Sequence, residues 1–178
     1  GNIWQRIDTV DGINSTSYID ENSNACLQSQ WYQIYATAGP DHTDSPWSDT
    51  LRTIFLDEPE LNICGNYVSL NWTNYVNMVP ELGGYQILAS EDGGPFQEVG
   101  LVDDTLVITF NHQNLNPGVL YTYKIRAVST DGSRTSSSCE QSIRFKTYAK
   151  PDYAHLRYAT VENNSDIRLE WIGDDAPV

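Results

Sequence analysis

The chain has no apolar run that approaches the roughly 20 residues a membrane-spanning helix needs. It is also poor in basic residues, with 10 Lys and Arg against 24 Asp and Glu and a formal net charge of −14. A surface this acidic repels phosphate backbones and anionic lipids. We therefore expect no nucleic acid among the partners of this protein and no membrane insertion, and we expect any secretion signal to lie upstream of residue 1.

Motifs of the common enzyme classes are absent: there is no G-x-S-x-G, H-E-x-x-H, phosphate-binding loop or G-x-G-x-x-G. The three histidines, His42, His112 and His155, are isolated, and we expect each at a loop or strand edge on the surface. The loop 41–44 (Asp-His-Thr-Asp) could ligate a metal, although an ordinary polar loop is the favoured interpretation. We predict no enzyme activity, no cofactor and no metal site.

Cysteine is scarce and odd in number, with Cys26, Cys64 and Cys139 and no C-x-x-C pair. An odd count cannot all pair within one chain. One disulfide with a free thiol and three buried thiols are both consistent with the sequence, so the pairing and the redox compartment stay open at this point.

Apolar residues alternate with polar ones along many short segments, which is typical of strands with one buried face. Clear examples are Val68–Trp72, Tyr121–Ala127 and Ile167–Trp171, and turn dipeptides such as Asp131-Gly132 separate such segments. No long stretch keeps helical spacing, so the sequence predicts an all-β chain. The expected strands of its central part are 60–64, 67–73, 84–90, 96–102, 105–111, 120–129 and 139–147.

The chain also repeats itself. Tyr32-x-Ile34-x-Ala36 recurs 91 residues later as Tyr123-x-Ile125-x-Ala127, and Val68-x-Leu70-x-Trp72 recurs 99 residues later as Ile167-x-Leu169-x-Trp171. A repeat of this length matches one small β-sandwich. Its phase predicts the C-terminal part of one module over 1–56, a complete module over 57–148 and the first strands of another over 149–178.

The run Leu115-x-Pro117-Gly118-x-x-Tyr121-x-Tyr123-x-Ile125 resembles the fibronectin type III signature at the sixth strand (F). The resemblance implies tandem immunoglobulin-like β-sandwich modules. In that family the tyrosine at the position of Tyr121 bonds the backbone upstream. Tyr123, which lies on the same strand face, is also expected to have a structural role. Trp72 and Trp171 resemble the tryptophan that packs between the sheets from the second strand (B). The first repeat departs from the pattern, because Gln30 stands where Tyr121 stands.

Three further segments resemble the repeats of gliding-motility-associated extracellular proteins of Gram-negative bacteria. They are 50–56, 135–139 and 155–161. Those proteins carry fibronectin-like modules ahead of a C-terminal domain for secretion and surface anchoring. The resemblance implies an extracellular or cell-surface location and a role in adhesion or as a spacer.

Aromatic residues suggest one alternative. If Tyr32, Ile34 and Ala36 face the core, then Trp31 and Tyr35 face outward, close to Trp47 at the start of the next strand. Exposed aromatic planes can stack on sugar rings. A carbohydrate-binding module, or an accessory domain of a surface glycan-degrading enzyme, is therefore the alternative to a non-catalytic structural and interaction module.

The terminal fragments predict self-association. The first fragment exposes the apolar face of strands Tyr32–Ala36 and Leu51–Leu56. The last carries a spare pair around Leu156–Val161 and Ile167–Trp171. Because bare faces and open edges recruit strands, we expect them to complement each other between molecules. Beyond this we expect protein or glycan partners at the cell surface.

Overall fold

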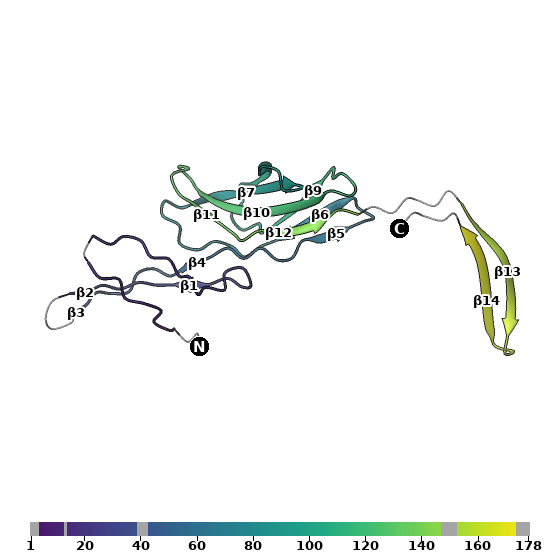
Figure 1. The fold of residues 1–178 in the computed structure, drawn as a ribbon, viewed down its shortest axis with the longest axis horizontal. Helices are drawn as coiled ribbons and strands as arrows, with labels where there is room; N and C mark the ends of the chain where they lie inside the picture. The colour runs from purple at the N-terminus through teal and green to yellow at the C-terminus, as the bar shows by residue number, and fades with distance from the viewer. Residues whose placement is uncertain (1–3, 13, 39–42, 147–152, 174–178) are drawn as a thin grey trace.

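The computed structural model describes residues 4–12, 14–38, 43–146 and 153–173. These residues form strands, turns and loops, and no helix occurs among them. The all-β prediction is confirmed. Figure 1 shows three parts along the chain: an N-terminal segment of short strands, a central sandwich and a C-terminal hairpin.

Two sheets make the central sandwich. The first has the order β5–β6–β9, and the second has the order β11–β10–β7–β8 with β12 also paired to β10. All pairings are antiparallel. The strands are β5 (Glu60–Asn62), β6 (Tyr67–Asn71), β7 (Leu82–Glu91), β8 (Gln97–Val102), β9 (Thr109–Gln113), β10 (Leu120–Ser129), β11 (Thr135–Ser137) and β12 (Gln141–Arg144).

Side chains from both sheets fill the space between them. The alternation along β10 is complete, because every second residue from Tyr121 to Ser129 is buried. β6 contributes Val68 and Leu70, and Trp72 follows directly after it. Gly100 on β8 lies against the Phe110 ring on β9, where a Cβ would come within 2.4 Å of the ring. The sandwich is therefore closed by direct contact between the sheets at this edge.

The sandwich starts earlier than the expected boundary at residue 57. Ile54 and Leu56 each have only 1% of their surface exposed and belong to the same core, and Leu56 pairs with Trp72. These two residues were expected to lie on the bare face of the first fragment, and that expectation is wrong. Their apolar side chains are instead packed in the core of the central sandwich.

Two of the expected central strands also differ in detail. The segment expected at 105–111 forms a turn and then β9 at Thr109–Gln113. The strand expected at 139–147 is shorter, as β12 (Gln141–Arg144), and a separate strand, β11, precedes it at Thr135–Ser137. Between the two, the Ser138 hydroxyl accepts the hydrogen bond of the Ile125 amide that a continuous strand would bond through its backbone.

The described residues of the N-terminal segment form four strands of two residues each. β1 (Trp31–Tyr32) pairs with β4 (Leu51–Arg52), and β2 (Thr37–Ala38) pairs with β3 (Thr43–Asp44). The continuous strand expected over 32–36 is thus broken. Residues 34–36 run between β1 and β2 and bond serine residues across from them, so this stretch is extended without regular ladder pairing.

The C-terminal hairpin consists of β13 (Ala154–Glu162) and β14 (Asp166–Gly173). It lies apart from the sandwich in Figure 1. Nearly all of its residues are exposed on both faces. Trp171, expected between two sheets, is 66% exposed, because no second layer covers this pair among the described residues.

Candidate functional site

The aromatic candidates lie on the N-terminal segment. Trp31 on β1 is 42% exposed, and the Arg52 guanidinium carbon lies 5.0 Å from the centroid of its ring. A guanidinium over an indole face is a favourable cation–π contact. One face of Trp31 is therefore occupied by Arg52 and is not free to stack on a sugar ring.

Tyr35 and Trp47 lie together but do not share a plane. Their ring centroids are 4.4 Å apart and their planes meet at 57°. Tyr35 is half-buried beneath Trp47, which is 61% exposed. The geometry presents one exposed indole supported by a tilted phenol, and not the flat pair that would stack on two neighbouring sugar rings.

The expected inward face of this segment is bare. Ile34 is 75% exposed and Ala36 is also exposed, while Tyr32 is half-buried. Expecting Ile34 and Ala36 in a core was therefore wrong for this structure. Their counterparts Ile125 and Ala127 are fully buried, because the sandwich supplies a second sheet that the N-terminal segment does not have among its described residues.

The structural residues of the sandwich form a well-defined aromatic set. Trp72 is buried with its ring edge-on to Tyr85, at a centroid distance of 5.4 Å. The Tyr85 hydroxyl accepts a hydrogen bond of 2.9 Å from the Tyr75 amide. The Tyr121 hydroxyl accepts one of 2.9 Å from the Asn116 amide, five residues upstream. This is the backbone contact that the fibronectin-like motif led us to expect.

His112 is not the surface residue that its isolation in the sequence suggested. Its Nδ1 lies 3.0 Å from the Tyr123 hydroxyl, and its ring is edge-on to both Tyr121 and Tyr123. Burial lowers the pKa of His112, opposed by the charge of Glu91. Burial raises the pKa of Tyr123, as do the neighbouring Tyr121 and Glu91. The cluster thus favours a neutral imidazole beside a protonated phenol.

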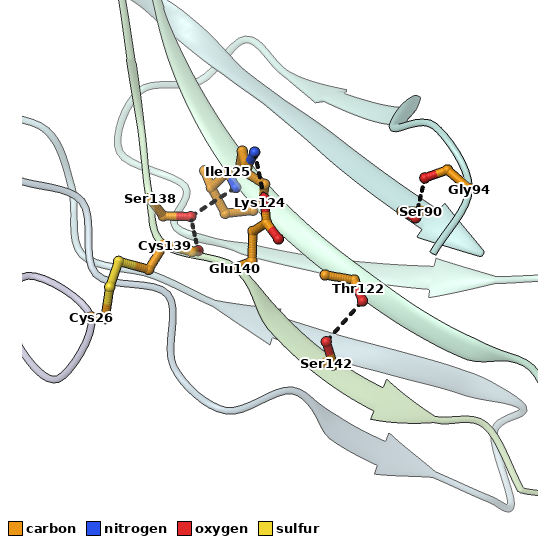
Figure 2. Close-up of polar contacts among 10 residues, drawn as sticks. All are labelled: Cys26, Ser90, Gly94, Thr122, Lys124, Ile125, Ser138, Cys139, Glu140 and Ser142. Carbon is orange, nitrogen blue, oxygen red and sulfur yellow. Dashed lines mark hydrogen bonds and ion pairs between the residues drawn. A yellow bond between two sulfur atoms is a disulfide. The ribbon is translucent and has the colours of Figure 1, made fainter. Parts of the chain in front are cut away.

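A disulfide joins the N-terminal segment to the sandwich. Cys26 is bonded to Cys139, which lies 113 positions further along the chain, with 5.2 Å between their Cα atoms, while Cys64 is free and exposed. Cys139 lies between β11 and β12, at the break in the edge strand (Figure 2). Of the two arrangements that the sequence left open, the structure has one disulfide with a free thiol.

The polar contacts around Cys139 hold this break in place. The Ser138 hydroxyl accepts a hydrogen bond of 3.0 Å from the Ile125 amide and donates one of 2.7 Å to the Cys139 carbonyl (Figure 2). Next to it, the Lys124 ammonium lies 2.8 Å from the Glu140 carboxylate. The disulfide is therefore attached to a point of the sandwich whose backbone is held by the buried strand β10.

Further hydrogen bonds join the N-terminal segment to the sandwich, and the sequence did not predict them. The Arg52 side chain donates to the Asn74 carbonyl, with 3.1 Å from Nε and 2.6 Å from Nη2. The Asn77 side-chain amide donates to the Thr50 carbonyl at 2.8 Å. We call Arg52, Asn74, Asn77, Cys26 and Cys139 the junction. A lone arginine and two loop asparagines carry no sequence pattern that would have identified them.

The proposed metal ligands Asp41 and His42 lie outside the described residues, and Thr43–Asp44 forms β3. Among the described residues, no group of three or more His, Cys, Asp or Glu side chains is placed to hold a metal ion. The part of the chain that the structure describes has no helix long and apolar enough to cross a membrane. No protein-family model matches this chain, and no curated protein matches it.

Proposed function

We propose that this chain is a non-catalytic structural and interaction segment of an extracellular protein, and that its sandwich is a fibronectin type III-like module. Two features support the module assignment. One is the division of strands into β5–β6–β9 and β8–β7–β10 with β11 and β12. The other is the Tyr121 contact to Asn116. Similar sandwiches host many functions, so the role is argued from the junction.

The observation that carries the proposal is the Cys26–Cys139 disulfide. A covalent bond between the N-terminal segment and the edge strand of the next sandwich restrains the angle between consecutive units. The Arg52 and Asn77 hydrogen bonds add restraints on the same junction. A series of modules joined in this way acts as a stiff spacer that holds other domains at a distance.

The same bond supports an extracellular location, since disulfides form and persist in oxidising compartments and are rare in the cytosol. An origin among gliding-motility-associated surface proteins rests on the sequence resemblance of segments such as 155–161. We propose on this basis that the chain belongs to such a surface protein and takes part in adhesion.

A distance measurement across the junction tests the spacer role. Spin labels at the exposed residues Thr37 and Gln113, introduced as cysteines with Cys64→Ser, report the separation of the two units by pulsed electron paramagnetic resonance. We expect a narrow distance distribution with the disulfide intact. Adding Cys26→Ser and Cys139→Ser should broaden it. A broad distribution in both proteins would refute the stiff spacer.

A carbohydrate-binding role is the second candidate, favoured by the exposure of Trp47 above Tyr35. Titration of a panel of soluble polysaccharides, followed by tryptophan fluorescence, tests it. Binding through this site predicts saturable quenching that Trp47→Ala removes. Trp171→Ala, a similarly exposed tryptophan on the distant hairpin, is the matched control. A flat response across the panel would exclude this candidate.

A further inference from the structure

The hairpin β13–β14 repeats the pairing of β5–β6, including its irregularity. In the sandwich Leu61 pairs with Val68 and Leu56 with Trp72. In the hairpin Val161 pairs with Ile167 and Leu156 with Trp171. In both cases the two pairs are five positions apart on the first strand and four on the second. The hairpin is therefore built as the first two strands of a sandwich.

Among the described residues, nothing packs against its core-facing side chains. Ile167 is 71% exposed and Leu169 is 51% exposed, whereas their counterparts Val68 and Leu70 are fully buried. In the sandwich, β6 reaches that burial by pairing with β9 on one side and facing β10 across the core. The surface that fits the hairpin is therefore a β9-like edge next to a β10-like face.

The N-terminal segment repeats the pairing of β10 with β11 and β12. Tyr32 pairs with Leu51 as Tyr123 pairs with Gln141. Thr37 pairs with Asp44 as Val128 pairs with Thr135. This segment is therefore built as the last two strands of a sandwich.

A single serine contact shows how close the likeness is. The Ser48 amide donates to the Ile34 carbonyl at 2.8 Å, and the Ile34 amide donates to the Ser48 hydroxyl at 3.0 Å. In the sandwich Ser138 and Ile125 make the same two bonds, at 2.9 and 3.0 Å. The bare face of Ile34 and Ala36 thus has the geometry of the face that β6 covers in the sandwich.

Residues 18–20 form no strand themselves but occupy the place of β9 in this segment. The Tyr32 hydroxyl donates to the Asp20 carboxylate at 3.1 Å, where the counterpart Tyr123 contacts His112. Asp20 therefore stands in the position of His112. By the same offset, Tyr18 and Ile19 stand in the positions of Phe110 and Asn111, and both are exposed.

We propose that the hairpin of one copy of this chain seats on the N-terminal segment of a second copy. β14 runs antiparallel to residues 18–20, with Leu169 opposite Tyr18 and Arg168 opposite Ile19, as Leu70 lies opposite Phe110 and Ser69 opposite Asn111 in β6–β9. The hairpin and the N-terminal segment lie at opposite ends of the sandwich in Figure 1, so the contact joins two molecules and extends head to tail.

The composite is smaller than the central sandwich, because none of the described residues between 4 and 52 corresponds to β7. Its contacts are the β14 edge and the apolar faces, which together exclude water from Ile34, Ile167 and Leu169. The proposal rests on this matching of registers and not on the spacer role, so either can fail without the other.

Cross-linking tests the register. Ile19→Cys and Arg168→Cys are placed in separate proteins, each with Cys64→Ser, and the two are mixed under mild oxidation. We expect the Ile19–Arg168 disulfide between chains, identified by peptide mass spectrometry. Thr160→Cys is the matched control for Arg168→Cys, because Thr160 pairs directly with Arg168 but lies one strand further from the edge. Equal yields for the two pairs would overturn the proposed register.

Light scattering tests the association itself. The mass should rise with concentration above the 20.0 kDa of one chain. Leu169→Ser should lower that rise, whereas Leu101→Ser, a similarly exposed leucine on β8, should leave it unchanged. A single-chain mass at every concentration overturns the proposal. A cross-link formed within one chain, when both cysteines are placed in the same molecule, also overturns it.

Discussion

The strand pairs β5–β6 and β13–β14 have the same register but differ in what covers them. Val68, Leu70 and Trp72 are buried against the second sheet, whereas Ile167, Leu169 and Trp171 occupy the same positions of the hairpin and are exposed. Alternation and turn position set the pairing, which is local. Burial needs a second layer, and a hairpin without one is marginally stable.

The edge strands show the same contrast. Ser48 and Ser138 make the same bonds to Ile34 and Ile125. Only Ser138 and Ile125 are buried. The same hydrogen bonds can thus form in an exposed and in a buried strand pair. How much they contribute to stability depends on whether water can reach the bonded groups.

Truncating the two equivalent tryptophans should show the largest difference. Trp72→Ala empties a buried position, so we expect the free energy of unfolding of the sandwich to fall by about 3–5 kcal/mol. Trp171→Ala removes an exposed ring and should change it by less than about 0.5 kcal/mol in the monomer. Denaturant unfolding followed by far-ultraviolet circular dichroism measures both. Similar losses would mean that burial does not separate the two pairs.

Removing the junction disulfide should have the next largest effect. The Cys26–Cys139 bond restrains a loop of more than 100 residues in the unfolded chain. We expect Cys26→Ser with Cys139→Ser to lower the free energy of unfolding by about 2–4 kcal/mol. Cys64→Ser, which removes an exposed free thiol, is the control and should have little effect. An unchanged denaturation midpoint in the double variant would contradict the stabilising role.

The equivalent serines should differ by a smaller amount. Ser138→Ala leaves the Ile125 amide without its side-chain acceptor in a buried site, at a cost of about 1–2 kcal/mol. Ser48→Ala exposes the Ile34 amide to water and should cost less than about 0.5 kcal/mol. Hydrogen exchange of the two isoleucine amides provides the measurement. The expected order is wrong if Ser48→Ala raises the exchange rate of the Ile34 amide by a larger factor than Ser138→Ala raises that of the Ile125 amide.

The smallest expected effect is a dependence of stability on pH through His112. Burial lowers the pKa of His112 in the folded state, so between that value and the ordinary value near 6.5 the unfolded chain binds more protons. This contribution to stability is complete above pH 6.5 and declines as the pH falls. We expect His112→Gln to flatten the decline between pH 7 and 5. His155→Gln on the hairpin is the control, and an equal effect of both variants would refute the assignment.

Much of the fold could be predicted from alternation and turn residues. The expected strands at 84–90, 96–102 and 120–129 lie within one or two residues of β7, β8 and β10. The break at Ser138 could not be predicted, because a side-chain hydroxyl that replaces a ladder bond leaves no periodic signal.

The candidate site was less accessible to sequence reasoning. The alternation that placed Trp31 and Tyr35 outward assumed a continuous strand, whereas β1 and β2 are interrupted and Arg52 lies over Trp31. The position of His112 against Tyr121 and Tyr123 also depends on which strand of the opposite sheet faces it. Neither contact follows from spacing along the chain.

The sequence by itself determined that this chain is β-structured, that it repeats, and where most of its central strands lie, since these depend on local alternation and turns. The tertiary structure decided which apolar faces are buried, that Cys26 pairs with Cys139, and that Ile54 and Leu56 belong to the central core. Those outcomes depend on contacts between segments that are far apart in the chain. The pattern of residues along the sequence does not specify which distant segments come into contact.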